Sequence, residues 1–532
     1  MSGDRPAHAG VYGVDQGRIM RTGIFNLVGA GVSALAGLAL TVVVTRGFDA
    51  SVAGVLFTLT SVFLILSAAA LLGAETGVVY LLAQQRVRDE TGRLRATVLV
   101  ATAPVVVASL VLAVALWAAA PWFVAVTLPD APDGTVAAVR VFAVFLPLST
   151  LSGVHLAVGR GLGSTRPHVL VERVLRPGLQ LIGVAAVLVA GWTSSAALAL
   201  AWAAPYALAV IVAVLWSARL RRRAERAGGE PVAAPGREDW GRFWRYSTPR
   251  AGTGLAQLAL QRLDVVLVAA LRGPVDAALY TAATRFLVIG QLGGQALAQS
   301  VQHRFSGLLA QDQHDEANQL YRMTTTWLIM LTWPFYLTWA IFGGQLMSVF
   351  GEGYQAGGDA GVVGIVLSLT MLVATACGMV STVQEMAGNT GVAFFQTMLA
   401  LGVNVVLNIV LIPSYGIVGA ALAWSAALLL KNLLPLFQLR RRHGLSPLSR
   451  GGLVAMAAAV GCYGALPLAA RLALGDHPLV GVGAVLLATV LYAALIWRNR
   501  QALQLAGLRK LRRRPAAAPA QPTSPPVETL VR

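Results

Sequence analysis

The stretch VVLNIVLIPSYGIVGAALAWS (405–425) is apolar on both sides of the short segment Pro-Ser-Tyr-Gly. An apolar run broken in this way predicts two helices joined by a tight turn, because proline interrupts a helix and glycine permits a turn. We expect Pro413 to stop the first helix and Gly416 to allow the reversal. The stretch therefore predicts a helical hairpin in an apolar environment.

The composition extends this prediction to most of the chain. The 532 residues are 56% hydrophobic and 12% charged, with a mean hydropathy of +0.68. A soluble protein carries roughly twice this charged fraction. Apolar runs recur from residue 24 to residue 497, and many reach the roughly 20 residues that a helix needs to cross a bilayer. The chain is predicted to be an all-α polytopic membrane protein, since a β-barrel would show a period of two.

About 14 transmembrane helices are expected from a hydropathy window of about 19 residues. The expected spans are 24–45, 52–74, 96–119, 136–158, 169–190, 195–216, 247–270, 277–303, 323–342, 361–382, 391–412, 416–437, 451–470 and 478–497. The first 23 residues are polar, so we expect no cleavable signal peptide and insertion directed by the first span.

The basic residues predict the orientation. The chain has 41 Lys and Arg residues and a formal net charge of +18. If the N-terminus lies inside, most of them fall on the inner side, and only Arg46, Arg272 and Arg471 fall on the outer side. This bias predicts a multi-pass protein of the cytoplasmic (inner) membrane with both termini cytoplasmic. It also assigns the positive charge to anionic membrane lipids and not to nucleic acid.

Three pairs of segments repeat at nearly one offset, which indicates an internal duplication. They are 45–65 with 271–291, 161–175 with 386–400, and 197–208 with 419–430. The offset covers six spans, so both copies are expected to share one membrane orientation. The predicted organisation is a cytoplasmic segment 1–23, a six-helix bundle 24–216, a cytoplasmic linker 217–246, a second six-helix bundle 247–437, two extra helices in 438–497, and a basic, then disordered cytoplasmic tail 498–532.

Two stretches of the second copy carry a family resemblance. The first, QRLDVVLVAALRGPVDAALYTAATRF (261–286), contains an Asp followed by a Gly-Tyr-Ala pattern. The second, GNTGVAFFQTMLALGVNVVLNIVLIPSYGIVGAALAWS (388–425), contains two Asn and the hairpin quoted above. The matching residues are Asp264, Gly273, Tyr280, Ala283, Asn404, Asn408, Leu411, Ile412, Pro413, Tyr415, Gly416, Gly419, Ala420 and Ala421. Over about residues 18–437, the chain resembles the polysaccharide flippases of the multidrug/oligosaccharidyl-lipid/polysaccharide exporter (MOP) superfamily.

The resemblance implies a V-shaped pair of bundles around a cationic cavity. Such flippases move undecaprenyl-pyrophosphate-linked sugar precursors of a surface polysaccharide across the membrane by alternating access. The two extra helices resemble the pair that lipid-linked cargo flippases carry beyond twelve. The implied partners are a lipid-linked oligosaccharide, membrane lipids and polysaccharide assembly proteins. No cofactor and no enzymatic activity are implied.

Ionisable residues inside spans are costly and therefore mark candidate sites. Arg262, Asp264 and Arg285 are expected at similar depth on the two helices that flank residue 273. Two Arg and one Asp leave an excess positive charge, which suits a phosphate because the guanidinium fork matches phosphate oxygens. The alternative is an Asp264–Arg285 ion pair, with Arg262 reaching Gln257 or Gln261.

Further candidates for binding the headgroup are Arg173, Arg176, Lys431, Gln257, Gln261 and Gln295. The two arginines could instead snorkel or pair with Glu172, and the glutamines could instead join helices. For Glu75, a structural ion pair with Arg21 is expected, with a proton site as the alternative. No metal site or catalytic motif is recognised, and the two cysteines are expected to be buried hydrophobic residues.

Three other functions remain open on the sequence. A cation-coupled multidrug exporter of the same superfamily would need acidic cavity residues, whereas the spans hold more basic than acidic groups. A peptidoglycan lipid-precursor flippase is another relative. A membrane glycosyltransferase or polysaccharide polymerase or ligase would commonly place catalytic residues in sizeable outer loops, whereas the expected outer loops here are short.

Overall fold

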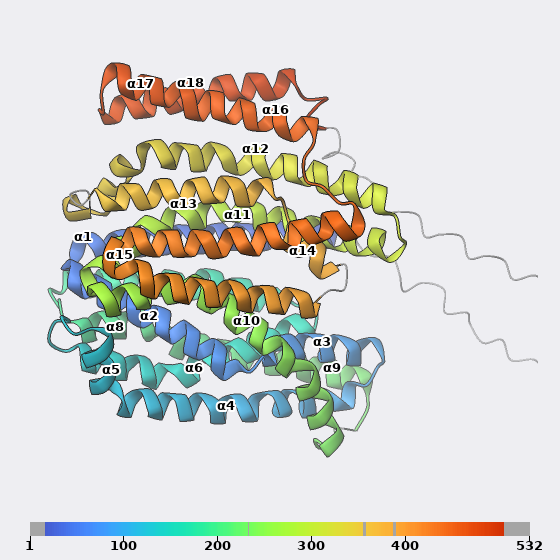
Figure 1. Ribbon diagram of the computed structural model, residues 1–532. Helices are drawn as coiled ribbons and strands as arrows, with labels where there is room; N and C mark the ends of the chain where they lie inside the picture. The colour runs from blue at the N-terminus through green and yellow to red at the C-terminus, as the bar shows by residue number, and fades with distance from the viewer. Residues whose placement is uncertain (1–15, 232, 355–357, 387–389, 505–532) are drawn as a thin grey trace, which may run out of the picture.

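The computed structural model describes residues 16–231, 233–354, 358–386 and 390–504. These residues form helices and loops, and no strand occurs among them. The long helices run side by side along one common direction (Figure 1). Eleven helices in the described part are long and apolar enough to cross a membrane. The structure therefore confirms the prediction of an all-α polytopic membrane protein.

The first half of the chain contains six predicted spans. Its elements are α1 (Gln16–Gly47), α2 (Ala50–Leu71), α3 (Ala74–Val87), η1 (Thr91–Arg93), α4 (Leu94–Ala118), α5 (Ala120–Thr127), α6 (Thr135–Gly161), η2 (His168–Leu175), α7 (Arg176–Val189), α8 (Ser195–Ala203) and α9 (Pro205–Gly228). The break between α2 and α3 lies at Leu72 and Gly73, which both have positive φ. A Cβ atom on Gly73 would collide with the Ser247 carbonyl, so the bend lets another helix approach closely.

The second half continues with longer helices. Its elements are α10 (Arg237–Arg272), α11 (Pro274–Ala310), α12 (His314–Met347), η3 (Ser348–Phe350), η4 (Glu352–Tyr354), α13 (Asp359–Ala376), α14 (Val380–Met386) and α15 (Thr390–His443). The C-terminal pair consists of α16 (Arg450–Ala459), η5 (Val460–Ala465), α17 (Leu466–Leu474) and α18 (Pro478–Arg498). The predicted spans 391–412 and 416–437 both fall within α15, which is broken in its middle.

The hairpin predicted for residues 405–425 corresponds to this break in α15. Gly416 has φ +54° and ψ −136°, a conformation that favours glycine, and the flanking residues are helical. A Cβ atom on Gly419 would collide with the Leu411 carbonyl, so the two arms touch at the turn. Pro413 lies inside the first arm. The expectation that Pro413 stops this helix was wrong, because the reversal falls three residues later, at the glycine.

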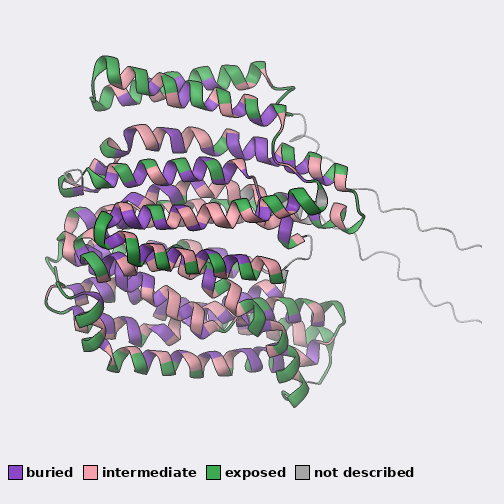
Figure 2. Cartoon of the chain, viewed as in Figure 1, coloured by how far each residue is buried: buried purple, intermediate pink, exposed green. Residues whose placement is uncertain are grey.

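Aromatic side chains fill the interior of each half. In the first half, Phe63 packs edge-on against Trp202, with ring centroids 5.6 Å apart. In the second half, Phe286 stacks on Trp339 at 4.1 Å. Helix α2 packs against both α10 and α11, so it joins the two halves. The C-terminal pair α16–α18 packs against α12 and is mostly exposed on its far side (Figure 2).

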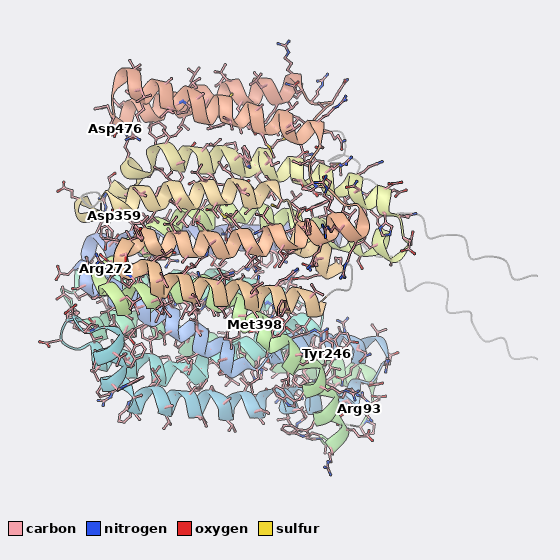
Figure 3. The ribbon with its side chains drawn as sticks, in the orientation of Figure 1. Arg93, Tyr246, Arg272, Asp359, Met398 and Asp476 are labelled. Atoms are coloured by element: carbon pink, nitrogen blue, oxygen red, sulfur yellow. The ribbon has the colours of Figure 1, made fainter. Side chains whose placement is uncertain are left out.

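The loops segregate to two ends of the molecule as the span prediction requires. Arg93 and Tyr246, which we expect on the inner side, lie at one end (Figure 3). Arg272, Asp359 and Asp476, which we expect on the outer side, lie at the opposite end. We refer to these as the Arg93 end and the Arg272 end.

Candidate functional site

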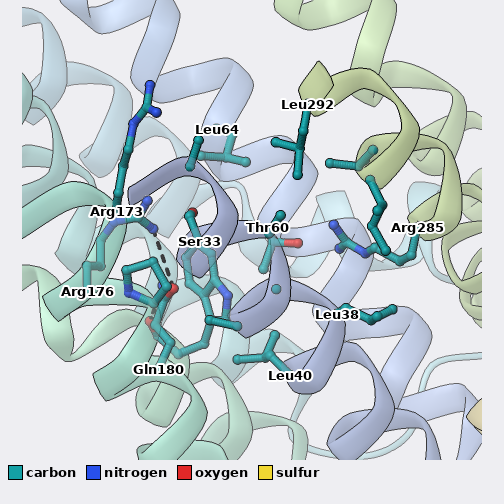
Figure 4. A pocket seen from close by; sticks show the side chains of 18 of the residues that line it. Ser33, Leu38, Leu40, Thr60, Leu64, Arg173, Arg176, Gln180, Arg285 and Leu292 are labelled. Carbon is teal, nitrogen blue, oxygen red and sulfur yellow. Dashed lines mark hydrogen bonds between the residues drawn. The ribbon is translucent and has the colours of Figure 1, made fainter. Parts of the chain in front are cut away.

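A cavity of about 360 Å³ lies where the two halves meet. Helices α1, α2, η2, α7 and α8 line it from the first half, and α10 and α11 line it from the second. Its wall includes Arg173, Arg176, Arg262 and Arg285, and no Asp or Glu among the described lining residues. Arg176 lies on one wall and Arg285 on the facing wall, with Thr60 between them (Figure 4). We call this space the cationic cavity.

Arg262 and Arg285 stand in the wall without an acidic partner in the described part of the chain. The structure gives neither side chain an ion pair within 4 Å or a hydrogen bond to another described residue, and the Nε atom of each is buried without a partner. The Arg285 guanidinium lies 5.8 Å from the ring centroid of Phe57. Unpaired guanidinium groups in a buried wall are costly unless an anion compensates them. These two arginines therefore give the wall positive charge that no described acidic residue offsets.

Arg176 is held differently, by its own counter-ion. Its Nη2 donates to Glu172 Oε1 at 2.5 Å, and its Nη1 donates to the Tyr206 hydroxyl at 3.1 Å. The π-helical η2 ends where α7 begins, and this junction places Glu172 and Arg176 four residues apart on one side. The predicted alternative of a Glu172–Arg176 pair is present. Arg176 is thus fixed and largely neutralised, although it still lines the cavity.

Arg173 connects the same segment to α1. Its Nη1 donates to the main-chain carbonyl of Asn26 at 3.0 Å. It has no carboxylate within 4 Å among the described residues, and it lines the cavity together with Ser33 and Gly37 of α1. Arg173 therefore brings a third positive charge to the cavity without a directly bound counter-ion.

Asp264 lies outside the cationic cavity. It is buried, and its carboxylate accepts from Asn408 Nδ2 at 2.8 Å and from the Tyr280 hydroxyl at 3.3 Å. The alternative of an Asp264–Arg285 ion pair was wrong, and Asp264 does not join the arginines as a lining residue. Arg262 and Asp264 lie at similar depth, but depth does not determine the direction of a side chain. Two positions along a helix turn the side chain by about 200°. Asp264 therefore faces α11 and α15 while Arg262 faces the cavity.

The remaining predicted polar residues divide between the cavity and other surfaces. Gln295 lines the cavity, whereas Gln257 and Gln261 are absent from its lining. Lys431 of α15 interacts electrostatically with Glu385 of α14 and also lies outside the lining. Of the nine predicted headgroup residues, the structure therefore gathers the four arginines and Gln295 at one site.

Glu75 has a partner that the sequence did not predict. Its Oε2 accepts from Arg160 Nη2 at 2.9 Å, which joins α3 to α6. Gly153 leaves room for this pair, since a Cβ atom there would lie 2.6 Å from Glu75 Oε1. The side chain of Arg21, the expected partner, lies outside the described residues.

The sequence prediction missed one cavity residue, Gln180, and one residue that supports the cavity wall, Tyr206. Gln180 lines the cavity, and its Nε2 donates to the Trp202 carbonyl at 3.0 Å. Tyr206 receives the hydrogen bond from Arg176 and packs against Phe63, with ring centroids 5.3 Å apart. The spacing of four between Arg176 and Gln180 was a usable signal, because it places both on one helical face. No local sequence pattern links Tyr206 to these residues.

Comparisons with known proteins agree with this architecture. The family model MatE matches residues 249–410, and a search among curated proteins found no match. Among solved structures, lipid II flippase MurJ in an inward closed conformation matches with a TM-score of 0.69 and 12% identity, over 90% of this chain and 99% of that chain. An inward-facing multidrug resistance MATE family transporter of the MOP superfamily matches with a TM-score of 0.63 and 15% identity, over 79% and 98%.

The chain has the fold of these transporters. A MOP superfamily transporter from Pyrococcus furiosus shares the MATE and MurJ fold as well, with a TM-score of 0.54 and 16% identity, over 81% of this chain and 96% of that chain. Its structure was described as having a binding pocket of reverse polarity. The MATE and MurJ fold thus accommodates pockets of different polarity, so the charge of the pocket in this chain has to be considered on its own.

Proposed function

We propose that the protein is a flippase that moves undecaprenyl-pyrophosphate-linked sugar precursors of a surface polysaccharide across the cytoplasmic membrane. The observation that carries the proposal is the pair Arg262 and Arg285, which stand in the cavity wall without an acidic partner among the described residues. Guanidinium groups bind phosphate oxygens through paired N–H donors. A diphosphate supplies several such oxygens and at least one negative charge for each of the two arginines.

In this mechanism the diphosphate binds between the two halves. Arg262 and Arg285 contact it from the second half, while Arg173 and Arg176 contribute positive potential from the first half. Gln180 and Gln295 supply amide groups that can hydrogen-bond sugar hydroxyls. The cavity volume of about 360 Å³ suits a headgroup, so the prenyl chain stays in the lipid. Rocking of the halves then exposes the headgroup alternately to each side.

The electrostatics of the cavity separate this proposal from a drug exporter. A cationic drug needs negative groups to offset its desolvation, whereas the described lining offers arginines and no carboxylate. The lining also lacks the paired carboxylates that a glycosyl-transferring site would use for acid and base chemistry. Binding and release of an anion is therefore the chemistry that these residues support best.

A peptidoglycan lipid precursor is the second candidate cargo. The MurJ structure covers 90% of this chain against 79% for the MATE structure, so its fold accounts for more of the molecule. Lipid-linked precursors of both kinds present a diphosphate next to sugars, so the four arginines would hold either. A transport assay that compares the two cargoes distinguishes them.

Reconstituted transport tests the proposal. We expect proteoliposomes with the wild-type protein to flip a fluorescent prenyl-diphosphate sugar, and Arg262→Ala or Arg285→Ala to lower the rate roughly 30-fold or more, because a buried charge contact is lost. The matched control is Arg140→Ala. Arg140 also lies in a predicted span, but it stacks on Trp117 at 4.5 Å and is absent from the cavity lining. Equal rates in all four proteins would refute the assignment.

A further inference from the structure

Arg46 joins the two halves of the chain at the Arg272 end. It lies in the last turn of α1, and its Nε donates to the Val349 carbonyl at 2.7 Å. Its Nη2 donates to the Ser348 carbonyl at 2.9 Å. These acceptors lie 303 and 302 residues further along the chain, in the η3 turn that follows α12. One side chain therefore makes two hydrogen bonds across the junction.

The chemistry of this contact favours arginine. Carbonyl groups in the last turn of a helix carry the negative end of its dipole. The Ser348 carbonyl already accepts from the Gly351 N–H at 3.1 Å, and its second lone pair can accept from the arginine. The planar guanidinium presents two N–H groups in parallel and can reach two successive carbonyls at once. Gly351 ends the acceptor turn with φ +118°, a conformation that favours glycine, and it lies beside Thr45 and Arg46 of α1. The arginine thus caps a helix of the opposite half.

A second contact lies at the same end. Gly54, in the first turns of α2, is buried against the Pro274 carbonyl at the start of α11. A Cβ atom on Gly54 would overlap that carbonyl, so the two backbones can approach this closely only with glycine. Together, the Arg46 and Gly54 contacts form a seam between the halves, which we call the Arg46 seam.

We propose that Arg46 is a latch that keeps the cationic cavity closed at the Arg272 end, and that the Arg46 seam separates when the cavity opens to that side. Both Arg46 bonds are exposed at the surface. Water can replace them when the seam parts, so the latch can be released without burying an unpaired charge. The inference concerns the conformational change itself and does not depend on which cargo the cavity binds.

Spin-label distances across the seam test the latch. Cys377 and Cys462 are first replaced by alanine, and labels are attached at Asp133→Cys in the first half and Asp359→Cys in the second, two exposed positions away from the seam contacts. Pulsed electron paramagnetic resonance on the full-length protein in liposomes then measures the distribution of distances between the two labels. Without Arg46 we expect the fraction with the longer distance to rise roughly tenfold, given the loss of two charge-assisted hydrogen bonds.

Three variants make the result specific. Arg272→Ala removes an arginine at the same end that pairs with Asp276 on its own hairpin at 3.2 Å, so we expect a wild-type distribution. Arg46→Lys keeps the positive charge but loses the two parallel N–H donors of the guanidinium. It should give a fraction of long distances between those of the wild type and Arg46→Ala. Gly54→Ala should also lengthen the distance by forcing α2 and α11 apart. A distribution unchanged in Arg46→Ala, or changed equally in Arg272→Ala, would overturn the proposal.

Discussion

At the scale of single residues, the arginines of the cavity differ in what compensates their charge. Arg176 has the Glu172 carboxylate at 2.5 Å, whereas Arg262 and Arg285 have no such partner among the described residues. Their roles should therefore differ as well. In the proposed function, Arg262 and Arg285 bind the anionic cargo directly. Glu172 neutralises part of the charge of Arg176 and so reduces the positive potential in the cavity.

Removing the Glu172 charge should strengthen anion binding. Glu172→Gln leaves Arg176 uncompensated, and an additional positive charge near the cavity should tighten binding of a prenyl diphosphate roughly tenfold. Fluorescence anisotropy with a labelled prenyl diphosphate measures the dissociation constant. The control is Glu225→Gln, since Glu225 also pairs with an arginine four residues away, Arg221, but lies outside the lining. An unchanged dissociation constant in Glu172→Gln would contradict this role.

Removing the side chains of Asp264 and Arg285 should have different effects on the stability of the protein. Asp264→Ala leaves the buried Asn408 and Tyr280 groups without their acceptor, which should lower the free energy of unfolding by about 1–3 kcal/mol. Arg285→Ala removes an unpaired charge from the wall and should leave stability unchanged or raised. Thermal unfolding in detergent without cargo compares the two. A larger loss for Arg285→Ala than for Asp264→Ala would show that Arg285 has a structural partner.

At the scale of the helices, the hairpin in α15 depends on a single backbone conformation. Gly416 adopts φ +54° and ψ −136°. We expect Gly416→Ala to lower the free energy of unfolding by about 1–3 kcal/mol, because a Cβ atom strains this conformation. The matched change is Gly402→Ala, in the same helix with helical backbone and open space around its Cα, which should be neutral or stabilising. Equal melting temperatures for the two variants would argue against a strained turn.

The helices also show which features of the fold sequence patterns can predict. Hydropathy located the long helices because the bilayer requires a minimum apolar length. It did not predict the bend at Leu72 and Gly73. The bend accommodates the close approach of α10 at Ser247, which lies more than 170 positions away in the chain. The depth of Arg262, Asp264 and Arg285 could be estimated from the helical rise. Their direction could not, because it depends on which helices pack on which face.

At the scale of the whole molecule, charged and apolar residues occupy different regions. Loop residues gather at the Arg93 and Arg272 ends, the interior of each half is aromatic and aliphatic, and four arginines meet where the halves join. The sequence predicted the four arginines and Gln295 through the cost of polar groups in spans. It could not predict that Gln257, Gln261 and Lys431 lie elsewhere, since those positions follow from the packing of the two halves.

The most direct test of the account varies the charge of the cargo and leaves the protein unchanged. Two fluorescent prenyl sugars are compared in proteoliposomes of the wild-type protein, one with a diphosphate linkage and one with a neutral linkage of similar length. We predict that the protein flips the diphosphate lipid well above the rate of protein-free liposomes and leaves the neutral lipid at that background rate. Equal flipping of both lipids would contradict the claim that the cationic cavity receives an anionic cargo.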